Sequence, residues 1–358
     1  MSARPLFCVL LAVAATTSAT AQSSTKYRPG RPSRPQPAAR AAPVRTPAPK
    51  PTRTPGADVA SASASGSTKP VEAGEVNWGR DLEAARRESA ADGRPVLILF
   101  QEIPGCAGCQ AFGRDVLSHP LIVEAIETEF HPVLVYNNRS GGPDAALLKR
   151  YNEPAWNYQV IRFVGADGRD LIERRDRVWT VAAVAGRIVE ALRAAGRPVP
   201  KYLHSLIAIN TPDIETAAFA MHCFWTGEYH LGNIDGVIAT EAGWLDGREV
   251  TLVRYDPAAL PLDRLASRAA GLECAHRVYT PDAKPLAGLD AGQLDDSYRP
   301  ASTSDQKRQL SRWPAIKKIP GINANQLTKL NSLAPRDVTA ALSHLSPRQR
   351  TWLRSRLQ

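Results

Sequence analysis

Cys223 lies in a run of residues whose types and order suit redox chemistry. The run reads Met221-His222-Cys223-Phe224-Trp225-Thr226-Gly227-Glu228. It follows a strand-like apolar stretch at 217–221, and we expect the cysteine to begin a helix. A helix N-terminus presents unpaired N–H groups and a positive partial charge, and both favour the reactive thiolate. Phe224 and Trp225 would form an apolar wall beside the sulfur. The run therefore predicts attack on a substrate that carries a methyl group next to a polar, reducible atom.

A second pair of thiols, Cys106 and Cys109, is separated by two residues. The pair follows a continuous apolar run at 95–100, typical of a buried strand, and precedes an expected helix at 110–117. Two thiols at this spacing form a reversible disulfide, and the helix start activates the first of them. The setting favours a redox-active pair, and a purely structural disulfide is the alternative.

Other uses of these two thiols find less support in the sequence. A haem-attachment motif would need histidine where Gln110 stands. A zinc site would need a second ligand pair, and the spacing of His119 and His131 does not suggest one. We expect no metal, flavin or nucleotide cofactor, because no Gly-rich phosphate loop is found either.

The Cys223 run resembles the active-site motif of the A-type peptide methionine sulfoxide reductases. The resemblance covers about residues 214–300. Four later segments resemble that family's motifs in the same order, namely 234–240, 243–247, 249–257 and 297–299. The resemblance implies a peptide-methionine (S)-S-oxide reductase with an α+β fold.

The same resemblance assigns roles to individual residues. Cys223 would attack the sulfoxide sulfur, while Glu249 would protonate its oxygen and Tyr298 would hydrogen-bond that oxygen. Phe224 and Trp225 would hold the methyl group, and Glu228 would support the motif.

The chain also departs from that family. His222 replaces a glycine, one long loop is missing, and the C-terminal resolving cysteines are absent. Cys274 is the spare thiol of this region. It could attack a sulfenic acid on Cys223, or it could be a small buried residue, and the sequence leaves both readings open.

The region around Cys106 resembles the thioredoxin-like family over about residues 76–200. The resemblance makes Cys106 the attacking cysteine and Cys109 the resolving one. Ile103-Pro104-Gly105 replaces the family's tryptophan-glycine start. The family's cis-proline is expected before the third strand, where Pro154 is the candidate.

These motifs require two α/β units to position them. In the first, 73–200, we expect strands at 131–136 and 159–164 beside the 95–100 run, helices at 81–92 and from 181, and a hairpin at Asp167-Gly168 that leads into 170–173. In the second, 201–300, we expect strands at 215–221, 234–243 and 249–255 and helices starting at Cys223 and near 262. Residues 301–358 read as a short helical extension with first-turn prolines at Pro335 and Pro347. We see no chemistry in that extension.

The N-terminal segment has a different character. Residues 1–21 read as a secretory signal peptide, with an uncleaved anchor as the alternative, and 22–72 as a disordered linker rich in Pro, Ala and Arg. Cleavage would remove Cys8 and leave four of the five cysteines and no transmembrane segment. We therefore expect a periplasmic or secreted protein.

The net charge of +10 comes from the two ends of the chain. Residues 22–70 carry nine basic residues and one acidic, residues 300–358 carry eleven and two, and the stretch between them carries 24 and 32. This pattern does not predict nucleic-acid binding, because no basic face with interleaved aromatic residues occurs in the core.

Together these features predict an exported thiol-dependent oxidoreductase. It would reduce methionine sulfoxide in oxidised envelope proteins, be recycled by its own Cys106/Cys109 pair, and draw on an external thiol reductant. The alternative is a thiol–disulfide exchange protein of the cell envelope whose second domain is a non-catalytic binding module. A cell-wall binding protein ranks last, because it does not explain the settings of the cysteines.

Overall fold

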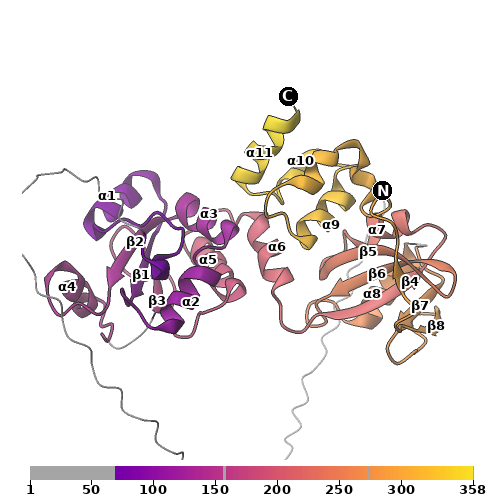
Figure 1. Cartoon of the computed structure of the whole chain (residues 1–358), viewed down its shortest axis with the longest axis horizontal. Coiled ribbons are helices and arrows are strands. Elements are labelled where there is room, and N and C mark those ends of the chain that lie inside the picture. Colours follow the sequence, from indigo (N-terminus) through magenta and orange to yellow (C-terminus); the bar gives the residue numbers. More distant parts are fainter. Residues whose placement is uncertain (1–68, 156–158, 273, 358) are drawn as a thin grey trace, which may run out of the picture. The chain divides into compact units, whose positions relative to one another are not determined.

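The computed structural model describes residues 69–155, 159–272 and 274–357. The expected signal peptide and most of the expected linker lie outside these residues. The described part of the chain is mixed α/β, with two β-sheets that follow each other along the sequence (Figure 1).

The first sheet has three strands in the order β2-β1-β3. Strand β1 (Val96–Gln101) runs parallel to β2 (His131–Tyr136) and antiparallel to β3 (Gln159–Val164). All three lie within one residue of the expected positions. Every residue of β1 is buried, as its unbroken apolar run predicts for a central strand covered on both faces.

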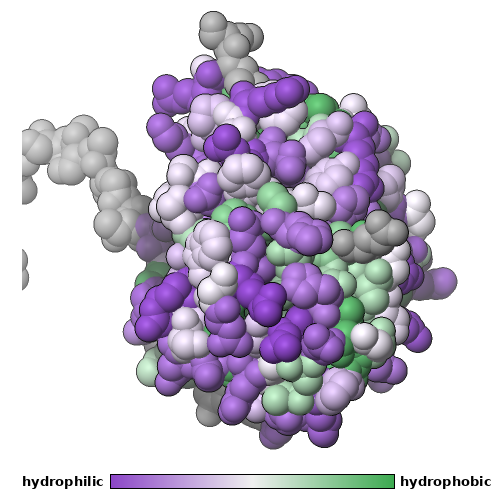
Figure 2. All heavy atoms as spheres, turned by 90° about the vertical axis from the view of Figure 1, so that its right-hand side faces the viewer, coloured by the Kyte–Doolittle hydropathy of each residue, from purple (hydrophilic) through white to green (hydrophobic). Residues whose placement is uncertain are grey.

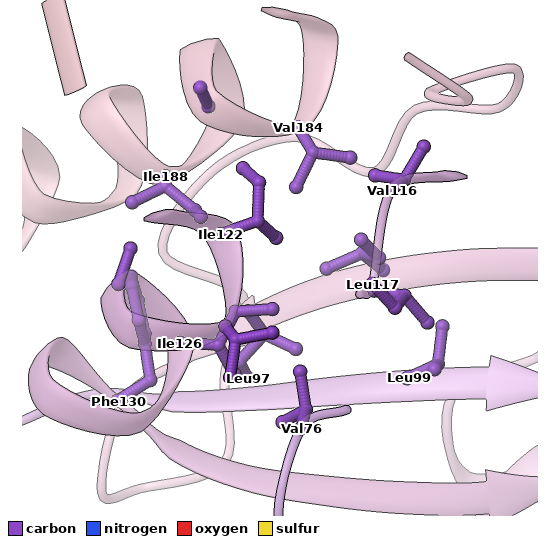
Figure 3. Close-up of a cluster of buried hydrophobic side chains, with 14 of the residues drawn as sticks. Val76, Leu97, Leu99, Val116, Leu117, Ile122, Ile126, Phe130, Val184 and Ile188 are labelled. Atoms are coloured by element: carbon purple, nitrogen blue, oxygen red, sulfur yellow. The ribbon is translucent and has the colours of Figure 1, made fainter. Parts of the chain in front are cut away.

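Helices cover both faces of this sheet. They are α1 (Leu82–Asp92), α2 (Ala107–Asp115), α3 (Pro120–Glu129), α4 (Gly142–Arg150), α5 (Val181–Ala194) and α6 (Lys201–Ile209), with a short 3₁₀ helix η1 (Val71–Ala73) before them. Leu97 and Leu99 of β1 pack with α2, α3 and α5 in one apolar cluster (Figure 3). Ile98 and Phe100 point to the opposite face and pack with α1 and α4. The core is therefore a sheet between two helical layers.

Three details of this domain differ from the sequence-based expectation. Residues 170–173 form no strand, because the turn at Gly168 leads only to a single bridge between Val164 and Asp170. Helix α6 buries Tyr202 and Leu203 in the cluster of α3 and α5, although it lies beyond the expected boundary at 200. The cis peptide bond recorded among the described residues joins Ile103 and Pro104, just before the cysteine pair, rather than preceding Pro154.

The second sheet has six strands in the order β8-β7-β4-β6-β5-β9. They are β4 (Glu215–Ala220), β5 (Val237–Leu245), β6 (Arg248–Tyr255), β7 (Arg277–Thr280), β8 (Asp290–Gln293) and β9 (Arg299–Pro300). The hairpin of β5 and β6 turns at Asp246-Gly247, where both residues have positive φ. The two strands therefore extend closer to each other than expected, since the first was expected to end at 243 and the second to begin at 249.

One face of this sheet carries α7 (Phe224–Leu231) and α8 (Leu262–Gly271). Both helices begin where the sequence predicted. Helix α7 lies very close to the sheet, because a Cβ at Gly227 would be 2.0 Å from Met221 Sδ and 2.2 Å from Thr251 Oγ1. Glycine is therefore required at this contact.

The C-terminal extension consists of short helices around its own apolar cluster. They are η2 (Arg308–Arg312), η3 (Pro314–Lys318), α9 (Ala324–Leu333), α10 (Val338–Leu342) and α11 (Pro347–Leu357). Pro347 starts a helix as expected, but Pro335 does not. It follows the end of α9, and Asp337 caps α10 through the N–H of Ala340.

The face of the molecule at the right-hand side of Figure 1 is mostly hydrophilic, with apolar side chains in small groups (Figure 2). Among the described residues, none of the helices has the length and apolar character needed to cross a bilayer.

Candidate active site

Cys223 and Glu249 meet at the N-terminus of α7. Cys223 is the N-cap of this helix and is half-buried, and its carbonyl accepts hydrogen bonds from the N–H groups of Thr226 and Gly227. The carboxylate of Glu249, on β6, accepts a hydrogen bond of 2.9 Å from the N–H of Phe224. A cysteine and a carboxylate are thus both placed at a helix end that favours negative charge.

Three aromatic rings form the apolar wall of this site. Phe224 is 4% exposed, and its ring contacts Trp225 at 6.0 Å and Trp244 at 5.5 Å between centroids, both edge-on. Trp244 is the cross-strand neighbour of Glu249 and is 43% exposed. Trp244 therefore joins the aromatic wall next to the strand position of Glu249. The sequence signal for this role was the position of Trp244 in segment 243–247, one of the segments that resemble the family's motifs.

Glu228 of α7 is fully buried and is held by Lys307 of the C-terminal extension. The Lys307 Nζ lies 2.5 Å from Glu228 Oε1, and the Lys307 backbone N–H donates to Oε2 at 2.7 Å. Arg308, the next residue, lies with its guanidinium carbon 4.9 Å from the centroid of the Trp225 ring. The extension therefore contributes to the site, contrary to our expectation that it carries no chemistry. No motif marked Lys307, because only the fold brings it to Glu228.

Helix α9 also fixes α7 and β5 through polar contacts. Ser332 Oγ donates to the Glu228 carbonyl at 3.2 Å, and Thr328 Oγ1 accepts from the N–H of Thr240 at 3.2 Å. These contacts join the second sheet and the extension.

Tyr298 lies elsewhere on the sheet. Its ring covers Gly243, where a Cβ would be 2.4 Å from the ring, and its hydroxyl donates to Glu241 at 2.8 Å. Side chains alternate along β5, so Gly243 and Glu241 share the face opposite to that of Trp244. Burial, followed by the neighbouring Glu241 carboxylate, raises the pKa of Tyr298 far above its usual value. The structure thus places Tyr298 with Glu241 and not with Cys223, Glu249 and the aromatic wall.

Cys274 is a buried residue of the α8 side of the sheet. It is 2% exposed, belongs to the apolar cluster with Phe219 and Leu265, and directs its thiol to the carbonyl of Leu272 at 3.4 Å. Burial raises the pKa of Cys274 to about 11, which disfavours the thiolate. This environment fits a packing residue better than a resolving thiol.

Cys106 and Cys109 lie at the start of α2, in the first domain. Their sulfurs are 3.5 Å apart, Cys106 is exposed as the N-cap of α2, and Cys109 is buried. Hydrogen bonds from the Cys109 N–H and thiol and from the Gly108 N–H lower the pKa of Cys106. Burial and the nearby Cys106 raise the pKa of Cys109 to about 12. The pair therefore combines an exposed thiol whose pKa is lowered with a buried thiol whose pKa is raised.

Cys106 borders a pocket of about 440 Å³. Phe112 of α2 and Val116, the C-cap of that helix, line it, together with Gln159 and the 47%-exposed Trp179. The exposed Cys106 thus lies beside a hollow lined partly by apolar side chains.

Comparison with known proteins identifies one domain type in this chain. A family model described as thioredoxin-like matches residues 77–155. The first domain is thioredoxin-like.

The chain is also similar to curated proteins named peptide methionine sulfoxide reductase MsrA. The relative from Methanococcus maripaludis strain C7 is 30% identical over 110 residues, which cover 26% of this chain and 66% of the relative. Those from Geobacter metallireducens and Methylobacterium nodulans are 35% and 39% identical over 72 residues, covering 44% and 32% of their lengths. The chain thus spans less than two thirds of the length of the curated relatives it matches.

Proposed function

We propose that this protein is a thiol-dependent oxidoreductase that reduces methionine sulfoxide in proteins, with its catalytic centre at Cys223. The observation that carries the proposal is the Glu249 carboxylate bound to the Phe224 N–H at the helix end capped by Cys223. The aromatic wall and the similarity to the named relatives add to it. The preference for the (S)-S-oxide rests on the family resemblance alone.

The chemistry follows from these positions. Glu249 takes the proton of the Cys223 thiol, the resulting thiolate attacks the sulfoxide sulfur, and Glu249 passes that proton to the sulfoxide oxygen. Methionine leaves as a thioether, and the oxygen remains on Cys223 as a sulfenic acid. Phe224, Trp225 and Trp244 surround the methyl group and exclude water.

The sulfenic acid must then be reduced by another thiol. We propose that Cys106 attacks it, releasing water and forming a mixed disulfide. Cys109 then attacks the Cys106 sulfur, which frees the Cys223 thiol and leaves a Cys106–Cys109 disulfide. An external thiol reductant restores the pair. The exposure and lowered pKa of Cys106 support this role, and the burial of Cys274 argues against a local resolving thiol.

Turnover on a methionine sulfoxide peptide tests the proposal. Purified protein with dithiothreitol should convert the peptide to the methionine form, as followed by mass spectrometry. Cys223→Ser should abolish conversion, while Cys274→Ser should retain it. Inactive wild-type protein on both sulfoxide epimers would contradict the proposal.

A second candidate function is thiol–disulfide exchange with a non-catalytic second domain. The position of Tyr298 away from Cys223 favours it, because the resemblance assigned that hydroxyl to the sulfoxide oxygen. Exchange of a model disulfide by Cys106, in protein that leaves methionine sulfoxide unchanged, would decide for this alternative.

We also propose that the protein works outside the cytoplasm, on oxidised envelope proteins. The support is the signal-like sequence at 1–21. Cell fractionation with an antibody against the chain would test the location.

A further inference from the structure

Three potential metal ligands converge at the start of α2. The sulfurs of Cys106 and Cys109 are 3.5 Å apart, and Glu102 Oε2 lies 3.8 Å from the Cys109 sulfur. One ligand atom from each of the three residues lies within 4.8 Å of the others. The sequence spacing alone offered no second ligand pair, but the fold adds a carboxylate from the segment just after β1.

Two of these separations are close to the edges of a tetrahedral zinc site. Zinc–sulfur bonds of about 2.3 Å place two thiolate sulfurs about 3.8 Å apart. Zinc–oxygen bonds of about 2.0 Å place a carboxylate oxygen about 3.5 Å from a ligating sulfur. The observed distances of 3.5 Å and 3.8 Å therefore lie within a few tenths of an ångström of both edges. Two thiolates and one carboxylate are ligands that zinc accepts.

The backbone between the ligands is shaped for this convergence. A Cβ at Gly105 would be 2.4 Å from the Glu102 carbonyl oxygen and 2.6 Å from Cys109 Cβ, so only glycine lets the loop fold back so closely. The buried Glu72 carboxylate accepts the Gly105 N–H at 2.8 Å and holds the loop in place. The loop is thus fixed with its ligands already close together.

The three ligands also differ in how far they are exposed to solvent, and this difference sets the side from which an ion can enter. Cys109 is buried, Glu102 is half-buried and Cys106 is exposed. An ion can therefore enter from the Cys106 side, and a water molecule can complete a fourth position there.

We propose that Glu102, Cys106 and Cys109 bind one zinc ion when the cysteine pair is reduced. Each thiol loses its proton as its sulfur–zinc bond forms, so binding releases up to two protons. The disulfide form has no thiolate to offer and does not bind. Because zinc occupies both sulfurs, bound metal withholds the pair from thiol–disulfide exchange.

Metal titration of the full-length reduced protein tests this site without any measurement of sulfoxide reduction. Cobalt(II), added without reducing agent after dithiothreitol removal, should give sulfur-to-metal charge-transfer absorption that zinc displaces at one equivalent. Cys223→Ser protein should behave as wild type, so the outcome does not depend on the proposed function. Protein oxidised to the Cys106–Cys109 disulfide should show no such absorption.

Two variants separate this three-ligand site from binding by the thiols alone. Cys109→Ser should abolish the charge-transfer absorption. Glu102→Gln, which keeps the side-chain shape, should weaken zinc binding on the order of tenfold or more in a chelator competition. The exposed Glu75→Gln serves as the matched control and should bind as wild type. No absorption in reduced wild type, or equal zinc affinity in Glu102→Gln and wild type, would overturn the proposal.

Discussion

The carboxylate of Glu249 lies 2.9 Å from the backbone nitrogen of Phe224, at the helix end that Cys223 caps. One hydrogen bond thereby fixes the proton donor proposed for the reaction relative to the proposed nucleophile. The strand β6 supplies the acid and the helix α7 supplies the thiol, so the packing of α7 on the sheet determines their separation.

Replacing the acid should slow the reaction without unfolding the protein. Glu249→Gln keeps the side-chain shape but cannot supply the proton, so we expect a loss of about 10²-fold or more in the rate of sulfoxide reduction. Single-turnover kinetics would measure it. The exposed Asp213→Asn is the control and should leave the rate unchanged. A wild-type rate in Glu249→Gln would remove Glu249 from the mechanism.

The third aromatic residue should matter for substrate binding. Trp244→Ala removes a 43%-exposed ring from the wall around Phe224, so stability should change little while kcat/KM for the sulfoxide peptide falls, mainly through KM. Steady-state kinetics and a thermal melt would show both effects. Trp179→Ala, an equally exposed tryptophan of the first domain, should leave this kcat/KM unchanged with dithiothreitol as reductant.

Breaking the ion pair between the extension and α7 should be costly. Lys307→Met leaves the fully buried Glu228 carboxylate without its cation, and we expect a loss of about 3–5 kcal/mol in the free energy of unfolding. Urea unfolding followed by circular dichroism would measure it. The double variant Glu228→Gln/Lys307→Met should recover part of the loss, and the exposed Lys318→Met should cost little. Equal stability of Lys307→Met and wild type would show that the pair does not hold the site.

The contact at Gly227 offers a second structural test. Gly227→Ala places a Cβ against Met221 and Thr251, so α7 must shift, and we expect about 1–3 kcal/mol of destabilisation together with reduced turnover. Gly186→Ala in α5 meets open space and should instead stabilise by about 0.5–1 kcal/mol. If both variants melted alike, the close approach of α7 would not limit stability.

The three cysteines whose pKa values are shifted should reach full alkylation reactivity at different pH values. The lowered pKa of Cys106 means that its thiolate forms at a lower pH than in an ordinary cysteine, so its alkylation rate should level off earlier as pH rises. Cys109 and Cys274, with pKa values of about 12 and about 11, should still be gaining reactivity above pH 9. Iodoacetamide labelling of reduced protein with peptide mapping would measure each site. Faster labelling of Cys109 than of Cys106 at neutral pH would reverse the assigned roles.

Local patterns in the sequence were sufficient for most of the secondary structure. Apolar runs located β1 and β3, and the positions of Cys106 and Cys223 just before helices followed from the switch between strand and helix patterns. The hairpin expected to lead into 170–173 has no second strand, because a turn signal cannot show whether the segment after the turn pairs with a neighbouring strand. The prediction that Pro335 starts a helix was wrong for a related reason, because proline suits both the start of a helix and the position just after one.

The site itself depended more on tertiary structure. The motif resemblance pointed to Cys223 and Glu249, which the fold brings together. It also pointed to Tyr298, but the pairing of β9 with β5 sets which face that ring covers. Lys307 and Glu102 carried no local signal, because each becomes meaningful only when the folded chain sets it beside Glu228 or Cys109.

The ion pair between Lys307 and Glu228 limits where the chain can be cut to give a folded fragment. A fragment cut after residue 300 would keep every strand of the second sheet yet leave a charged group stranded in an apolar interior. Such a piece would be prone to misfold, and its inactivity would say nothing about the chemistry. Truncations that aim to isolate the part of the chain that carries Cys223 should therefore retain the chain at least through α9.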